Sequence, residues 1–298
     1  MAPKPPKEFH ATKRLQREYE KAISRITKRV LAPKKPEQTL QEWLAEIAAK
    51  SQAQEVRSAA EFVAGRMVAQ VNAKNARTWR EAAARSQKTR RLYKLMQAEL
   101  EGPVGRRLRQ LRKENADYIT SVAPVAAEML TREITKAQLA GARPETIAKM
   151  ARARFPQLLR SRVNLIARTE TQKASAVLTR ARAEHAGIHC YEWTTSEDQR
   201  VRKSHKKMNG VIVFYADPPE PERLFPETTK SGRPVRSTLG AYHAGECPNC
   251  RCPQLPCVDV DDIKFPARVY SRGAVRRVNK QEFLKIAASY GAHNTAAA

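Results

Sequence analysis

The chain has 298 residues, of which 41% are hydrophobic and 6% aromatic, enough for one large or two small domains around a modest core. Lysine and arginine outnumber aspartate and glutamate by 56 to 30, and the net charge of +26 favours a polyanionic partner such as DNA, RNA or an acidic protein surface. The scarce aromatic residues argue against a stacking platform for single strands. No apolar run reaches about 18 residues, which excludes a membrane-spanning helix.

Residues 1–36 are predicted to form a basic arm that contains five prolines. A short helix is expected within it, around Leu15–Val30. The residues after Met1 include no apolar stretch, so we expect no secretory signal peptide.

Residues 37–113 are predicted to form a basic helical region. Apolar residues recur at spacings of three and four between Val56 and Val71, which marks one face of a helix. Gly102-Pro103 breaks that pattern, and a new helix is expected to follow. Five basic residues after the break are predicted to contact nucleic acid: Arg106, Arg107, Arg109, Arg112 and Lys113. The alternative is that these side chains only form the solvated face of a helical bundle.

Residues 114–265 are predicted to form an α+β domain. One helix is expected to end at Pro156, and a longer one to run from about Ser161 to Ala186. Strand-like alternation begins after Gly187, and a proline-rich excursion follows over residues 217–238.

Residues 266–298 are predicted to form a basic C-terminal tail with a short helix around Gln281–Ser289. The expected fold class is therefore α+β: a mostly helical, basic N-terminal part followed by a small α+β module with a Cys/His cluster.

Cysteines concentrate in one segment: four of the five lie within eleven residues, and Cys190 stands apart. Cys247-x-x-Cys250 has the spacing of one half of a tetrahedral zinc site, and the other half must come from elsewhere. We predict one structural Zn²⁺, with these candidate ligands: His205, His243, Cys247, Cys250 and Cys252. The alternatives are free cysteines in a small core and a redox or catalytic thiol, for which a base and an orienting group are missing.

A second set of residues is predicted to form a structural network. Its members are Arg168, Thr169, Glu170, Asp198 and Arg200. Buried, hydrogen-bonded pairs among them would fix the packing of the long helix, whereas an exposed ion pair would contribute little.

Asp198 with His205 could also indicate a metal-dependent nuclease, but such a site needs a second acidic ligand and a phosphate-orienting group. The chain has no phosphate-cradling loop, no nucleophile elbow and no H-E-x-x-H motif, so we do not expect an enzyme.

Four stretches follow one another in a recognisable order: Glu114–Thr120, Ile166–Thr171, Trp193–Gly210 and His243–Cys252. Together they resemble the phage head morphogenesis family, the minor capsid proteins similar to the F protein of phage Mu. The resemblance covers roughly residues 104–255. Family members often have cysteine at the positions of Arg202 or His205, and those with the extra cysteine resemble zinc binders. His205 could replace that cysteine as a ligand, whereas Arg202 could not.

The resemblance implies a minor head protein of a tailed phage that acts in head morphogenesis and genome ejection. The implied partners are the phage portal protein, packaged double-stranded DNA bound without sequence preference, and the major capsid or scaffold protein, with no membrane involved. The implied location is the virion head near the portal, after assembly in the host cytoplasm. The alternatives are a metal-dependent nuclease and a stand-alone DNA-binding protein.

Overall fold

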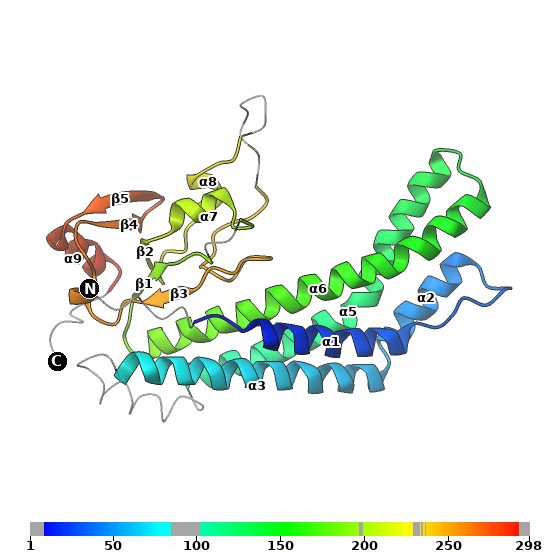
Figure 1. Ribbon diagram of the computed structural model, residues 1–298, viewed down its shortest axis with the longest axis horizontal. Helices are drawn as coiled ribbons and strands as arrows, with labels where there is room; N and C mark the ends of the chain where they lie inside the picture. The colour runs from blue at the N-terminus through cyan, green and yellow to red at the C-terminus, as the bar shows by residue number, and fades with distance from the viewer. Residues whose placement is uncertain are drawn as a thin grey trace. The chain divides into compact units, whose positions relative to one another are not determined.

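The computed structural model describes residues 9–84, 102–196, 199–228, 233, 235 and 237–291. The chain divides into two compact units. We call residues 1–11, 71–108 and 172–298 the sheet unit, and residues 12–70 and 109–171 the helical unit. Figure 1 labels the helices and strands of both units.

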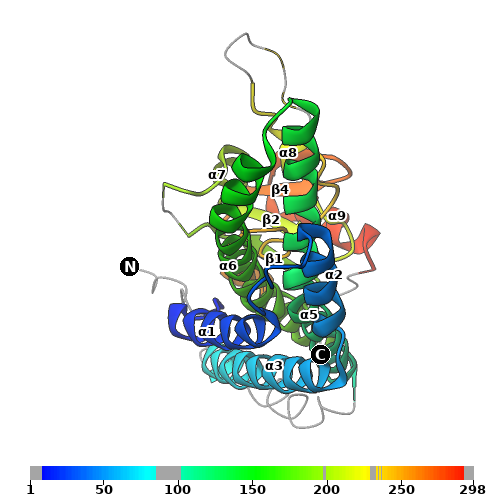
Figure 2. The same cartoon turned by 90° about the vertical axis from the view of Figure 1, so that its right-hand side faces the viewer.

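The helical unit is built from five helices or parts of helices. Their full bounds are α1 Lys13–Val30, α2 Leu40–Ser51, α3 Gln54–Ala84, α5 Pro103–Leu139 and α6 Pro144–His185. The predicted helix around Leu15–Val30 is confirmed as α1, which begins where Thr12 accepts a hydrogen bond from the Leu15 amide. α1 lies beside the helical-unit part of α3 (Figures 1 and 2), where Gln70 Nε2 donates to Glu18 Oε2 at 3.4 Å.

A buried polar contact joins α1 to α5 among the apolar side chains of the helical unit. Tyr19 on α1 donates its hydroxyl to Asn115 Oδ1 on α5 at 2.8 Å, and Asn115 Nδ2 donates to the Leu111 carbonyl at 2.8 Å. The ring of Trp43 packs edge-on against Phe155, with centroids 5.2 Å apart. The polar pair is fully satisfied, so it costs little to bury and fixes how α1 meets α5.

The prediction that a helix ends at Pro156 is wrong, because α6 continues through this residue from Pro144 to His185. An interior proline removes one backbone hydrogen bond and costs about 3 kcal/mol. Phe155, Leu158 and Leu159 flank it and are buried. Each buried side chain of this size contributes about 1.5–3 kcal/mol, which outweighs the lost hydrogen bond.

The sheet unit contains one five-stranded sheet in the order β3-β1-β2-β4-β5. The strands are β1 Cys190–Trp193, β2 Val211–Phe214, β3 Gln254–Pro256, β4 Ala267–Ser271 and β5 Ala274–Val278. The β2–β4 pair is parallel and the other pairs are antiparallel. The strands are connected through α7 Lys203–Met208, α8 Pro221–Leu224 and the 3₁₀ helix η1 Val260–Asp262, and α9 Lys280–Ser289 follows the last strand.

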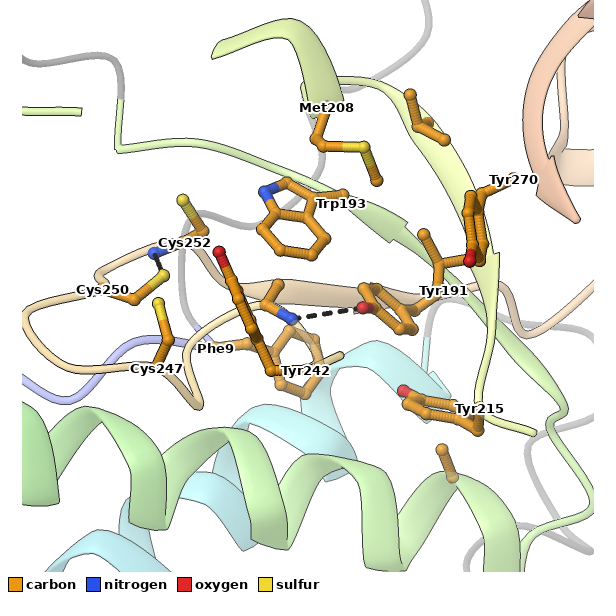
Figure 3. Close-up of a cluster of buried hydrophobic side chains, with 14 of the residues drawn as sticks. Phe9, Tyr191, Trp193, Met208, Tyr215, Tyr242, Cys247, Cys250, Cys252 and Tyr270 are labelled. Atoms are coloured by element: carbon orange, nitrogen blue, oxygen red, sulfur yellow. Dashed lines mark hydrogen bonds between the residues drawn. The ribbon is translucent and has the colours of Figure 1, made fainter. Parts of the chain in front are cut away.

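Both faces of the sheet are covered, which explains why β2 is apolar at every position. One face carries Tyr191, Trp193 and Val211, which pack with Met208 and the three cysteines of residues 247–252 in the first core cluster (Figure 3). The other face carries Cys190, Ile212 and Phe214, which pack against Phe283 of α9 in the second core cluster. Alternation along β1 and β2 therefore divides their side chains between two separate cores.

Residues 9–11 of the predicted basic arm pack within the sheet unit, while residues 1–8 lie outside the described residues. Phe9 is buried, and its ring meets Trp79 edge-on with centroids 5.5 Å apart. Ser175 Oγ donates to the Phe9 carbonyl at 3.0 Å, and Lys74 Nζ donates to the His10 carbonyl at 2.7 Å. Residues 9–11 are therefore a packed part of the sheet unit.

The predicted tail of residues 266–298 differs from the structure. Its helix is present as α9, but β4 and β5 precede it and form a hairpin that extends the sheet. Arg272 and Gly273 both have positive φ values, 48° and 82°, as a two-residue hairpin turn requires. Exposed arginines on both strands gave this segment the composition of a tail and concealed its alternation.

The expected fold class is confirmed: an α+β chain with a helical N-terminal part, a small sheet and a Cys/His cluster. None of the helices in the described part of the chain has an apolar stretch long enough to span a bilayer.

Candidate metal centre

Three of the predicted ligands converge in the sheet unit: His205 on α7, and Cys250 and Cys252 in the loop before β3. All three are buried, and their ligand atoms lie within 4.8 Å of one another. His205 Nδ1 is 3.6 Å from Cys250 Sγ and 3.5 Å from Cys252 Sγ. Tetrahedral zinc, with bonds of about 2.0–2.1 Å to nitrogen and 2.3 Å to sulfur, places these atoms about 3.5–3.6 Å apart. The donor types and spacings fit a zinc ion.

The cysteine loop, residues 243–252, turns tightly and holds its three cysteines close to one another (Figure 3). Asn249 adopts a φ of 58°, in the left-handed region that asparagine tolerates well, and the Cys250 amide donates to the Cys247 carbonyl at 3.1 Å. The Gly245 amide lies 3.3 Å from Cys250 Sγ and the Cys252 amide 3.5 Å from the same atom. Amide donors of this kind stabilise a thiolate.

The cysteine loop is anchored on α6 by a close approach and an ion pair. Gly245 has a φ of +83°, and a Cβ atom there would lie 2.9 Å from Ala176 Cβ and 3.1 Å from the Cys252 carbonyl oxygen. The adjacent Glu246 pairs with Arg180 of α6 at 3.1 Å. Only glycine fits at residue 245 without displacing the loop or the helix.

Cys247 is the fourth candidate ligand. Its side chain hydrogen-bonds to both Cys250 and His205, although it lies outside the tightest group of three. The hydrogen bond to Cys250 and burial raise the pKa of the Cys247 thiol. Arg202 Nη1 donates to Cys247 Sγ at 2.9 Å, and its Nη2 donates to the Pro248 carbonyl at 2.9 Å. Arg202 has no metal-binding atom of its own, and it contacts a candidate ligand instead.

His205 is oriented through its second ring nitrogen. Nε2 lies 2.8 Å from the Tyr242 hydroxyl, which donates to both carboxylate oxygens of Glu222 at 2.8 and 2.6 Å. Because Tyr242 donates to Glu222, its oxygen accepts from Nε2–H, and Nδ1 is left to face the sulfur atoms. A ligating histidine commonly has its other nitrogen held in this way.

Hydrogen bonds to its neighbours favour a charged His205. Burial lowers the pKa of His205, but hydrogen bonds to Cys247, Cys250 and Glu222 outweigh it and raise the pKa to about 11. Burial also favours a neutral Glu222, yet the hydrogen bonds from His205 and Tyr242 lower its pKa to about 2. In the absence of metal, an imidazolium between thiols and a carboxylate is the favoured state, and a metal ion would replace that positive charge.

The structure does not bring His243 into this group. Its Nδ1 lies 3.3 Å from the Tyr191 hydroxyl, and its ring meets Tyr191 and Tyr215 edge-on. Burial, with the charge of Arg180, lowers the pKa of His243 to about 3, so it is a neutral side chain packed against two tyrosines of the first core cluster.

The residues of the predicted structural network fall in different places. Arg168, Thr169 and Glu170 lie on α6 in the helical unit, with Thr169 and Glu170 buried. Arg200 is exposed in the sheet unit, and Asp198 lies outside the described residues. Glu170 lies close enough to Tyr19 for its charge to reinforce burial, which raises the pKa of that phenol.

The predicted nucleic-acid contacts all lie on α5. Four of the side chains are exposed and Arg107 is half-buried. A separate basic surface borders the cluster of His205, Cys250 and Cys252. A cavity of about 70 Å³ there is lined in part by Arg200, Arg202 and Arg251.

Sequence reasoning missed Tyr242 and Glu222, which position His205. Tyr242 precedes His243 and offers no ligand pattern of its own, and Glu222 lies in the proline-rich excursion. Arg202 did stand out in the motif that leads to His205, but its contact with Cys247 depends on the fold.

The fold and the site define a class: a helical chain with a small α+β module built around a Cys/His cluster. Residues 128–255 match the family described as "Phage Mu protein F like protein". The predicted resemblance is confirmed over these residues, which include three of the four motifs, β1, β2 and the His205, Cys250 and Cys252 cluster; Glu114–Thr120 lies before the match.

An uncharacterized protein of Haemophilus influenzae is 30% identical to the chain over 145 residues. That alignment covers 49% of this chain and 28% of the relative, so the chain spans less than a third of the relative's length. No solved structure matches the chain.

Proposed function

We propose that the protein is a minor head protein of a tailed phage, associated with the portal and with packaged DNA, that acts in head morphogenesis and genome ejection. The observation that carries the proposal is the family match over residues 128–255, the region that holds the Cys/His cluster. The net charge of +26 supports it, because cations offset phosphate repulsion inside a DNA-filled shell.

The proposed DNA contact runs along α5, where Arg106, Arg109, Arg112 and Lys113 are exposed. Four phosphate contacts give a slope of log K against log salt of about −3.6. Binding at these positions reads phosphate charge alone, so it should not depend on base sequence.

The test compares binding to two double-stranded DNAs of unrelated sequence over a salt series. Changing the four α5 residues to Gln should reduce the magnitude of the slope by about 3.6 for both DNAs. The matched control changes four exposed basic residues of the sheet unit to Gln: Lys264, Arg276, Arg277 and Lys285. If the control lowers the slope and the α5 variant leaves it unchanged, α5 is not the DNA-binding surface.

The virion role is tested by quantitative mass spectrometry of purified particles before and after DNA release. A few copies in full heads that are lost from emptied shells support a DNA-associated, ejected protein. Copies that persist support a fixed part near the portal, and absence from particles contradicts the proposal.

We also propose that the sheet unit holds one structural Zn²⁺. His205, Cys250 and Cys252 would bind it, with Cys247 as the fourth ligand. When bound, the ion would link α7 to a loop 45 residues further along the chain. Three thiolates and one imidazole close a tetrahedral sphere and leave no position for a reactive water, so we propose no enzymatic role.

The zinc proposal is tested by measuring the metal content of the purified protein and its melting temperature with and without a chelator. About one zinc per chain and a lower melting temperature after chelation support it. No zinc and an unchanged melting temperature contradict it.

A further inference from the structure

Cys190 and Cys257 lie opposite each other on neighbouring strands. β1 and β3 pair antiparallel with Tyr191 opposite Pro256, so the next pair along the ladder is Cys190 with Cys257. The Cys257 amide donates to the Cys190 carbonyl at 3.0 Å, which extends the ladder to this pair. Residues directly opposite in a sheet direct their side chains to the same face.

The backbone geometry at this pair suits a disulfide. Cys190 and Cys257 occupy a hydrogen-bonded position of the antiparallel ladder, because the Cys257 amide donates to the Cys190 carbonyl directly opposite it. Such pairs have Cα atoms about 5.5 Å apart, inside the range of about 4.4–6.8 Å found for disulfides. The two side chains also hydrogen-bond to each other.

This pair is separate from the metal group. Cys190 and Cys257 pack in the second core cluster, on the α9 face of the sheet. Cys247, Cys250 and Cys252 pack in the first core cluster, on the opposite face. The two sets of cysteines therefore do not compete for the same partners.

We propose that Cys190 and Cys257 form a redox site, which closes to a disulfide when a small-molecule disulfide such as oxidised glutathione acts on it. Cys257 is partly exposed, whereas Cys190 is buried, so Cys257 reacts first. Its thiolate attacks one sulfur of oxidised glutathione, forms a mixed disulfide and releases one glutathione thiolate.

The Cys190 thiolate then attacks the Cys257 sulfur of the mixed disulfide. The Cys190–Cys257 bond forms, and the second glutathione leaves as a thiolate. Two protein thiols are oxidised, one glutathione disulfide is reduced to two glutathione molecules, and the two thiol protons pass to solvent and then to the leaving thiolates.

The environment of the pair makes it slow to react. The hydrogen bond with Cys190 and burial raise the pKa of Cys257, and only the thiolate is a nucleophile. We therefore expect the disulfide to form slowly, as a structural cross-link and not as a rapid redox sensor. The disulfide itself does not depend on the proposed phage role, although its timing, on leaving the reducing host cytoplasm, rests on that role.

The experiment incubates the full-length, zinc-supplemented protein in glutathione buffers of increasing oxidation. Free thiols are then alkylated and the protein is digested with trypsin without reduction. Cys190 lies in tryptic peptide 183–200, and Cys257 in peptide 252–264. We expect a cross-linked pair of these peptides to accumulate over hours, and fragment spectra should place the link at Cys257 rather than at Cys252.

Two variants complete the test. Cys257→Ser and Cys190→Ser should each abolish the cross-link and leave the zinc content at the wild-type level. A wild-type protein that remains fully alkylated at Cys190 and Cys257 in the most oxidising buffer overturns the proposal, as does a link from Cys190 to Cys252. A protein that lacks zinc but forms the Cys190–Cys257 cross-link contradicts the zinc proposal and supports the disulfide proposal.

Discussion

Substituting alanine for Gly245 would introduce two separate costs at one position. The backbone there has a φ of +83°, a conformation that costs a residue with a Cβ about 1–2 kcal/mol. The new methyl group would lie 2.9 Å from Ala176 Cβ and 3.1 Å from the Cys252 carbonyl oxygen. Overpacking of this kind costs about 1–3 kcal/mol. Together, the free energy of unfolding should fall by about 2–5 kcal/mol.

Two other glycines of the sheet unit separate these costs. Gly187 has a φ of +72° with nothing within 4 Å of an added Cβ, so Gly187→Ala should lose only the backbone contribution. Gly240 is also open and does not need a positive φ, so Gly240→Ala should leave stability nearly unchanged. Denaturant unfolding of all three variants, with zinc content measured in parallel, gives the comparison.

From most to least stable, the expected order of the variants is Gly240→Ala, Gly187→Ala and Gly245→Ala. Movement of the cysteine loop in Gly245→Ala should also weaken zinc binding, since the Gly245 amide lies 3.3 Å from Cys250 Sγ. If Gly245→Ala is no less stable than Gly187→Ala, the close approach of the loop to α6 does not constrain the fold and the reasoning is refuted.

Cys252→Ser should abolish stoichiometric zinc and lower the melting temperature, as measured by metal analysis and calorimetry; retention of both would remove Cys252 from the ligand set. Tyr242→Phe leaves Glu222 without its phenol donor, so it should cost about 1–3 kcal/mol and weaken zinc binding about 10–100-fold in a chelator competition, whereas wild-type affinity would contradict the positioning role. Tyr19→Phe leaves the buried Asn115 Oδ1 without its donor, so denaturant unfolding should report a loss of about 1–3 kcal/mol, with zinc content unchanged; an unaltered midpoint would show that water replaces the phenol.

The elements that sequence predicted well are those with a local signal. The helix around Leu15–Val30 is present as α1, and the helix expected after Gly102-Pro103 is present as α5, which begins at Pro103. The prediction at Pro156 was wrong because it used only the local tendency of proline to end a helix. The burial of its neighbours along α6 stabilises the helix by more than the proline costs. The hairpin of β4 and β5 was missed because its arginines resemble a tail in composition.

The candidate site shows the same division between local and distant information. Residue types and the Cys-x-x-Cys spacing pointed to the cysteine loop, but they could not choose between His205 and His243 as the histidine that lies beside it. That choice depends on which histidine faces the sulfur atoms, and α7 and the strand pairing decide it. The pairing of Cys190 with Cys257 likewise depends on strand register, because the register decides which residues of β1 and β3 lie opposite each other.

The excursion between β2 and the cysteine loop leaves and rejoins the module at nearly one point, because the Tyr242 amide donates to the Pro219 carbonyl at 3.0 Å. A loop whose ends already meet tolerates extra length well, since doubling it costs only about 0.6 kcal/mol of closure entropy. Exposed positions such as Glu227 and Ser237 are therefore suitable places to insert an epitope or a fluorescent reporter. Such a tagged protein would allow the chain to be followed through particle assembly without disturbing the residues that gather around His205.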